Sequence, residues 1–157
     1  MSIEVWGNVG VSAAISLSAA GSCFGTGIAG LAAIGAWKRC ILEDRGLPFI
    51  LIAFVGAPLS QTIYGLLLMK ALSKEASELV AAGTLGANFT HLIAAGIFGG
   101  IAIGLSALMQ GKAAAAAADA VGETGKGLGN FIMVLGIIES VGLFVMVFLM
   151  LTIGKLA

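Results

Sequence analysis

Charged side chains are scarce in this sequence. Lysine, arginine, aspartate and glutamate make up 10% of its 157 residues, hydrophobic residues make up 59%, and the mean hydropathy is +1.10. A soluble domain carries roughly 25% charged residues, and the helix-length stretches here lack the polar face that a soluble bundle needs. The composition therefore excludes a water-soluble fold and predicts an all-α integral membrane protein.

Neither sign of charge predominates, and proline is also rare. The 8 basic and 8 acidic residues cancel, so nothing indicates a nucleic-acid partner. With 2 prolines and almost no polar low-complexity sequence, no disordered linker is expected, and residues 1–157 are predicted to form one membrane domain. The start lacks the basic region of a signal peptide, so the first apolar run is expected to stay as a membrane helix. Cys23 and Cys40 differ in depth along that run, so no disulfide is expected.

Apolar stretches long enough to cross roughly 30 Å of hydrocarbon recur along the chain. They cover residues 11–37, 48–72, 88–111 and 128–153, with connections at 38–47, 73–87 and 112–127. These stretches predict two helical hairpins, 11–72 and 88–153. The alanine run 113–118 predicts that the third helix continues beyond the membrane.

The prolines and the flanking residues add detail to these helices. Pro48 suits the first turn of the second helix. Pro58 lies inside it and is expected to bend it, freeing a carbonyl about one turn earlier. Trp6 and Trp37 are expected as interfacial anchors at the two ends of the first helix.

Basic residues indicate the orientation. The first and third connections hold Lys38, Arg39, Arg45, Lys112 and Lys126, whereas the opposite side holds Lys70, Lys74 and Lys155. The excess favours cytoplasmic connections at 38–47 and 112–127, with both termini outside.

Short motifs indicate an internal duplication. Phe24-Gly25 and Gly30-Leu31 of the first helix recur as Phe98-Gly99 and Gly104-Leu105 in the third. In the even-numbered helices Gln61 aligns with Glu139. Because each half has two spans, the halves share one orientation, which makes the chain a parallel tandem repeat.

Small residues follow one another every four positions on the first and third helices. Those of the first are Gly21, Gly25, Ala29 and Ala33, and those of the third are Gly96, Gly100 and Gly104. Small residues at this spacing allow helix backbones to approach closely in lipid. The even-numbered helices are instead rich in bulky apolar residues, so the pattern favours odd-numbered helices on the crowded inside of a ring of hairpins.

Glu139 is the only acidic residue well inside any apolar run. A carboxylate at the bilayer centre costs roughly 2.5–3.5 kcal/mol on insertion scales, so it must face inward, be protonated or carry a cation. A structural acid that bonds neighbouring helices is the alternative to a functional site.

Polar groups at similar depth predict a cation site around that carboxylate. Ala57, Ser60, Gln61 and Tyr64 share one face of the second helix, and Gln110 lies towards the end of the third. Their amide, hydroxyl and carbonyl oxygens, with the Ala57 carbonyl included, are ligands that hard cations prefer. Each polar residue taken alone is also compatible with an ordinary hydrogen bond between helices.

At these residues the chain resembles the proteolipid (c-type) subunits of V-type rotary ATPases, and more narrowly the K subunit of bacterial sodium-pumping enzymes. The similarity lies in Pro-Leu-Ser-Gln-Thr-Ile-Tyr-Gly at 58–65, Gln-Gly-Lys-Ala-Ala at 110–114, and the Ile138-Glu139 pair. The family often has Thr where Ser60 stands and Leu where Ala57 stands; neither departure removes a ligand, although a smaller residue at 57 loosens the site.

The resemblance implies a function. Glu139, Gln61, Gln110, Ser60 and the Ala57 carbonyl would bind one Na⁺ per protomer, with the Tyr64 phenol steadying the carboxylate. The protein would itself be non-catalytic. It would form a homo-oligomeric rotor ring in the lipid bilayer, against a stator subunit with an arginine and on central-stalk subunits, and would pump ions with no organic cofactor.

Other classes of function stay open. The same rotor role with H⁺ as coupling ion is the first alternative, because a buried carboxyl binds a proton with few ligands. A small cation or multidrug antiporter also has about four helices and a membrane glutamate, but it usually carries the acid early in the chain. A purely structural membrane assembly is the third. Nucleotide binding and soluble catalysis lack any phosphate loop or activated nucleophile here.

Overall fold

Helices account for the whole architecture of the part of the chain that the structure describes. The computed structural model describes residues 3–154, with side chains from Asn8 onward, so Trp6 lies outside the described side chains. No strand occurs within this range. The elements are α1 (Ile3–Leu42), α2 (Leu51–Gly56), the 3-10 helix η1 (Ala57–Leu59), α3 (Ser60–Ala81), α4 (Leu85–Thr124) and α5 (Leu128–Ile153).

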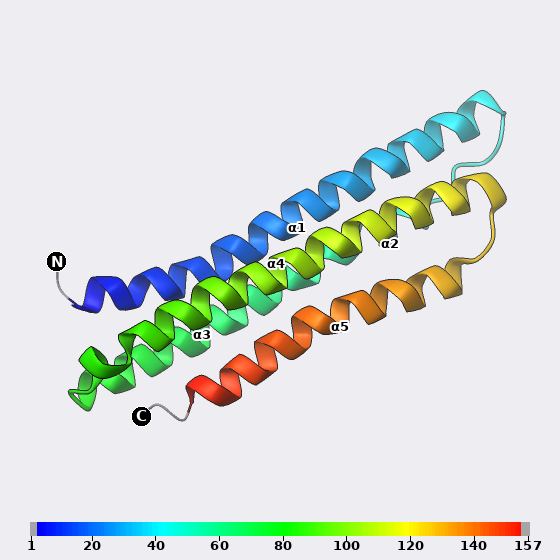
Figure 1. Cartoon of the computed structure of the whole chain (residues 1–157). Coiled ribbons are helices and arrows are strands. Elements are labelled where there is room, and N and C mark those ends of the chain that lie inside the picture. The colour runs from blue at the N-terminus through cyan, green and yellow to red at the C-terminus, as the bar shows by residue number, and fades with distance from the viewer. Residues whose placement is uncertain (1–2, 155–157) are drawn as a thin grey trace.

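Among the described residues, 4 helical stretches are long and apolar enough to cross a membrane, which confirms the predicted all-α membrane fold. They are Asn8–Leu42, Leu51–Ala81, Leu85–Thr124 and Leu128–Ile153. They lie side by side as long rods, with α1 and α4 running in one direction and α3 and α5 in the other (Figure 1). The α1–α2 and α4–α5 connections meet at one end of the bundle, and α1 begins and α5 ends at the other (Figure 1).

The helices are longer than the apolar runs, so the predicted connections were too wide. Helical structure covers most of 73–87 and 112–127, and the connections shrink to residues 43–50, 82–84 and 125–127. Strong helix formers carry the helices past the apolar stretches. The 40-residue α4 ends at Thr124, and the next residue, Gly125, has a φ of 66°, the left-handed conformation that terminates helices.

The structure agrees with the expectation for Pro58 but not with that for Pro48. Pro58 occupies η1, where a 3-10 turn joins α2 to α3, in agreement with the expected local distortion. The prediction for Pro48 was wrong, because α2 begins only at Leu51. The Pro48 carbonyl instead accepts the Trp37 indole N–H at 3.0 Å, which fixes the loop onto the end of α1.

Backbone contact between α1 and α4 confirms the close packing that the small-residue stripes predicted. A methyl group at Gly21 would overlap the backbone of Gly104, and one at Gly96 would overlap that of Gly10. Such overlap means that only glycine allows this helix separation.

The two glycines that the motif alignment makes equivalent, Gly25 and Gly99, have different packing partners. Gly25 packs on Gly111 and Ala107, whereas Gly99, its supposed equivalent, meets the side chains of Leu149 and Leu68 instead. The two glycines therefore serve different contacts. Equivalent residues of a repeat need not contact one another, so the internal duplication stays a prediction.

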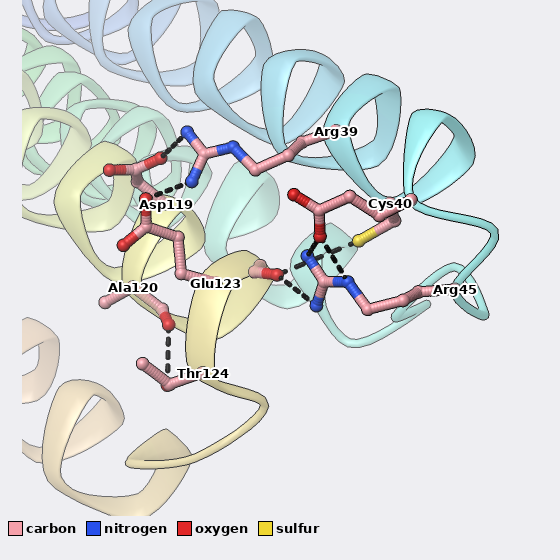
Figure 2. Close-up of polar contacts among 9 residues, drawn as sticks. Arg39, Cys40, Arg45, Asp119, Ala120, Glu123 and Thr124 are labelled. Atoms are coloured by element: carbon pink, nitrogen blue, oxygen red, sulfur yellow. Dashed lines mark hydrogen bonds and ion pairs between the residues drawn. The ribbon is translucent and has the colours of Figure 1, made fainter.

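Charged residues join the elements at the loop end of the bundle. Arg39 pairs with Glu123 and, at 3.2 Å, with Asp119, and Arg45 donates to the Gly122 carbonyl at 2.9 Å (Figure 2). Cys40 is buried beside the same carbonyl and Cys23 is exposed, so both are free thiols, as predicted. Solvent-exposed ion pairs contribute little to stability one by one, but these contacts together connect α1 and the loop after it to the end of α4.

Candidate functional site

A polar layer divides the buried core. One apolar cluster includes Leu68, Ile103 and Met146, and the other includes Phe54, Ala114 and Leu135. The residues between them on α3, α4 and α5 are polar: Gln61, Ser106, Gln110 and Glu139. This layer lies near the middle of the apolar helices, at the depth where a charge is most costly.

Glu139 on α5 is half-buried and is held from two other helices. The Tyr64 hydroxyl on α3 donates to Oε1 at 2.8 Å, and Nε2 of Gln110 on α4 donates to Oε2 at 3.3 Å. Both carboxylate oxygens thus accept hydrogen bonds from neutral donors. Hydrogen bonds to a carboxylate in a dry environment are stronger than those between neutral groups.

Two glutamines extend this network inward. Nε2 of Gln61 donates to Oε1 of Gln110 at 2.7 Å, and both side chains are 0% exposed. Gln110 also donates to the Leu135 carbonyl at 3.1 Å. A buried amide without partners costs about 1–3 kcal/mol, so this pairing stabilises both residues.

Three oxygens gather where η1 meets α3. The Ser60 hydroxyl lies 3.2 Å from the Ala57 carbonyl oxygen and 3.2 Å from Oε1 of Gln61. The distortion at Pro58 places these groups together at the start of α3. The structure therefore brings together all the residues predicted for the site: Ala57, Ser60, Gln61, Tyr64, Gln110 and Glu139.

A single carboxyl group, hydrogen-bonded to neutral polar side chains, gives this site its chemical character. No group of three or more His, Cys, Asp or Glu side chains gathers within the described range. The donor set is therefore a carboxylate, two amides, hydroxyls and a backbone carbonyl, all hard oxygen ligands. Such a set suits a proton or a monovalent cation, and cation binding here stays a prediction.

Sequence reasoning missed Ser106. Its hydroxyl on α4 donates at 2.9 Å to the carbonyl of Ile138, the residue before Glu139. Ser106 lies one turn before Gln110, so their spacing puts both on one face of the helix. That spacing was the available signal, but the acceptor is a backbone carbonyl and leaves no mark in the sequence.

Ser22 and Thr26 on α1 form a second polar feature that was not predicted. Their hydroxyl oxygens are buried and have no hydrogen-bond partner among the described residues. Gly25 packs on Pro58 and Gly65 on Ser18, so Ser22 lies between these contacts at the level of Gln61. Buried hydroxyls are nearly always bonded in proteins, which makes this pair exceptional.

Residues 93–152 match the family model of the ATP synthase C subunit. The matched segment takes in most of α4 and nearly all of α5, and so includes Ser106, Gln110 and Glu139. No curated protein matches the chain significantly. The match therefore bears on the second hairpin, which carries the carboxylate.

Proposed function

We propose that the chain is the ion-carrying rotor-ring subunit of a V-type ATPase that pumps sodium, with one Na⁺ bound at Glu139 in each protomer. The observation that carries the proposal is the carboxylate of Glu139, held at mid-membrane depth by Tyr64 and Gln110. The family match over residues 93–152 supports the rotor role. The protein itself is non-catalytic in this proposal and takes its energy from ATP hydrolysis elsewhere in the complex.

Electrostatics provides the mechanism. With an ion or a proton bound, Glu139 has no net charge and can pass lipid without the full cost of a buried charge. Once the ion leaves, the carboxylate is an anion and must face water or a cation. A stator arginine would serve that purpose, so rotation of the ring would carry each ion from one aqueous half-channel to another.

Sodium is favoured by the number of neutral oxygens near the carboxylate. The Ser60 hydroxyl lies within hydrogen-bonding distance of both the Ala57 carbonyl oxygen and Oε1 of Gln61. Oε1 of Gln110 is linked to this group because it accepts a hydrogen bond from Nε2 of Gln61. Each oxygen has a second lone pair for a cation. Proton binding alone would require only the carboxyl group, so a set this large favours a metal ion.

The surroundings of the site support assembly in a bilayer. Large apolar side chains are exposed along α1, α4 and α5, among them Phe24, Phe98 and Phe144. We infer that lipid and neighbouring copies cover them in a homo-oligomeric ring, with α1 and α4 inside and α3 and α5 outside. The connections near 38–47 and 112–127 would then face the cytoplasm and the central stalk, with both termini outside.

Carbodiimide labelling of Glu139 in detergent-purified protein tests the ion. Sodium in the millimolar range, near neutral pH, is expected to slow labelling of the wild-type protein, whereas choline at equal ionic strength is not. Glu139→Gln provides the unlabelled control. Equal labelling rates in sodium and choline would contradict the sodium proposal and leave the proton as the coupling ion.

The mass of the intact detergent-solubilised assembly tests the rotor role separately. A closed ring of many copies is expected. A monomer or a dimer would contradict the rotor proposal and favour a small antiporter.

A further inference from the structure

Two side chains of α4 donate to backbone carbonyls of α5 in the turn that leads into Glu139. Ser106 donates to the Ile138 carbonyl at 2.9 Å, and Gln110 donates to the Leu135 carbonyl at 3.1 Å. The donors are one turn apart on α4, and their acceptors are nearly one turn apart on α5. The backbone leading into Glu139 is thus fixed to α4 at two points.

Gly142 allows the first of these bonds to form. A methyl group at that position would lie 3.3 Å from the Ser106 hydroxyl oxygen and 3.4 Å from Cγ of Gln61. The first distance is slightly tighter than ordinary van der Waals contact, and the second lies at its lower limit. A side chain there would therefore push against the hydroxyl that bonds the Ile138 carbonyl.

Ser106 differs from most other helical hydroxyls of this chain. Those that donate to a carbonyl four residues earlier in their own helix are Ser12, Ser16, Ser18, Ser77, Thr124 and Thr152. That bond is the common local solution for a hydroxyl in a helix. The Ser106 hydroxyl crosses to another helix instead, although it is 7% exposed and has its own helix beside it.

We propose that Ser106 is a positioning residue that sets the rotation of α5 about its axis, so that Glu139 faces Tyr64 and Gln110 instead of lipid. The inference rests on the proposed ion-carrying role of Glu139. A carbonyl bond fixes the helix itself, whereas the bonds to the carboxylate fix only one flexible side chain. Loss of the hydroxyl should leave the ligands present but shift the carboxylate away from them.

The rate of carbodiimide labelling at Glu139 in sodium-free buffer tests this inference, together with the sodium concentration that halves the rate. The full-length detergent-purified protein is compared with Ser106→Ala and Gly142→Ala. Ser140→Ala is the matched control, because Ser140 follows Glu139 directly and donates to the Ile137 carbonyl of its own helix at 2.7 Å.

Ser106→Ala is expected to speed labelling and to raise the half-protecting sodium concentration, each by about fivefold, the equilibrium factor of one ordinary hydrogen bond. Gly142→Ala should shift both quantities in the same direction. The Ser106→Ala/Gly142→Ala double variant should shift both quantities only slightly more than the stronger single variant does. The reason is that both substitutions disrupt the same hydrogen bond. Ser140→Ala should match the wild-type protein.

Several results would overturn the positioning role. One is wild-type behaviour of Ser106→Ala, and another is an equal shift in Ser140→Ala. A third is a lower unfolding temperature with unchanged labelling and protection. If Ser106→Ala does not fold, Ser106→Cys keeps the volume with a weaker donor and takes its place. If sodium does not protect the wild-type protein, the sodium proposal fails, while the sodium-free labelling rates still decide the role of Ser106.

Discussion

The hydroxyl of Tyr64 on α3 donates a hydrogen bond of 2.8 Å to Oε1 of Glu139 on α5. Tyr64 is the only tyrosine of the chain, and it lies opposite the only acid well inside an apolar run. The bond joins the two helices at the depth where an unpaired carboxylate would cost most. Oε2 accepts the longer bond of 3.3 Å from Gln110, so it is the more available of the two oxygens to a cation.

Tyr64→Phe is expected to weaken sodium binding. A hydrogen bond to a charged group contributes roughly 1.5–3 kcal/mol, which corresponds to about a tenfold to hundredfold rise in the half-protecting sodium concentration. The measurement is protection of Glu139 from carbodiimide. Ser77→Ala is the control, because its exposed hydroxyl bonds only the Ser73 carbonyl of α3. Equal protection in the two variants would exclude Tyr64 from the site.

The glutamine pair should behave as one unit in stability measurements. Gln61→Leu removes the donor to Oε1 of Gln110, a bond of 2.7 Å between fully buried groups. Each single leucine variant is expected to lose about 1–3 kcal/mol, because a buried amide is left without its partner.

The Gln61→Leu/Gln110→Leu double variant should lose less than the two single losses added. Thermal or denaturant unfolding in detergent measures all four members of this cycle. Additive losses would mean that the two amides do not interact.

Replacing a glycine of α1 by alanine should lower the stability of the protein where the glycine faces α4 and raise it where the glycine faces open space. Gly21→Ala places a methyl group into the backbone of α4 at Gly104 and should destabilise the protein by several kcal/mol. Gly27 has nothing within 4 Å of such a methyl group. Gly27→Ala should therefore gain about 0.8–1.0 kcal/mol from helix propensity.

Unfolding temperature of the two glycine variants, measured in the same detergent, checks the difference. Destabilisation of the isolated protomer by Gly27→Ala, or none by Gly21→Ala, would contradict the packing of α1 on α4.

Removal of the Ser22 hydroxyl and removal of the Ser18 hydroxyl should change the unfolding temperature in opposite directions. Ser22 has no hydrogen-bond partner among the described residues, whereas Ser18, one turn earlier and equally buried, donates to the Ala14 carbonyl at 2.7 Å. Removing an unpaired buried hydroxyl relieves a desolvation cost of about 1–3 kcal/mol. Ser22→Ala is therefore expected to raise the unfolding temperature, and Ser18→Ala to lower it. A lower unfolding temperature for Ser22→Ala would instead indicate a water molecule bound there.

The amino-acid sequence by itself determined the membrane-spanning all-α fold and the residues of the candidate site. Long apolar runs have no stable alternative to helices in lipid, because every backbone polar group must be bonded internally. A buried carboxylate stands out against such a background, and three- and four-residue spacings place Ser60, Gln61 and Tyr64 on one face. These are local properties that depend on the residue types alone.

Only the tertiary structure decided the ends of the helices, the register of α1 on α4 and the hydrogen-bond partner of Ser106. Stripes of small residues fit one another at several registers, so the sequence leaves open which glycines of α1 and α4 meet. The bond from Ser106 ends on the backbone of Ile138. Every residue has a backbone carbonyl, so the acceptor emerges only when two helices lie against each other.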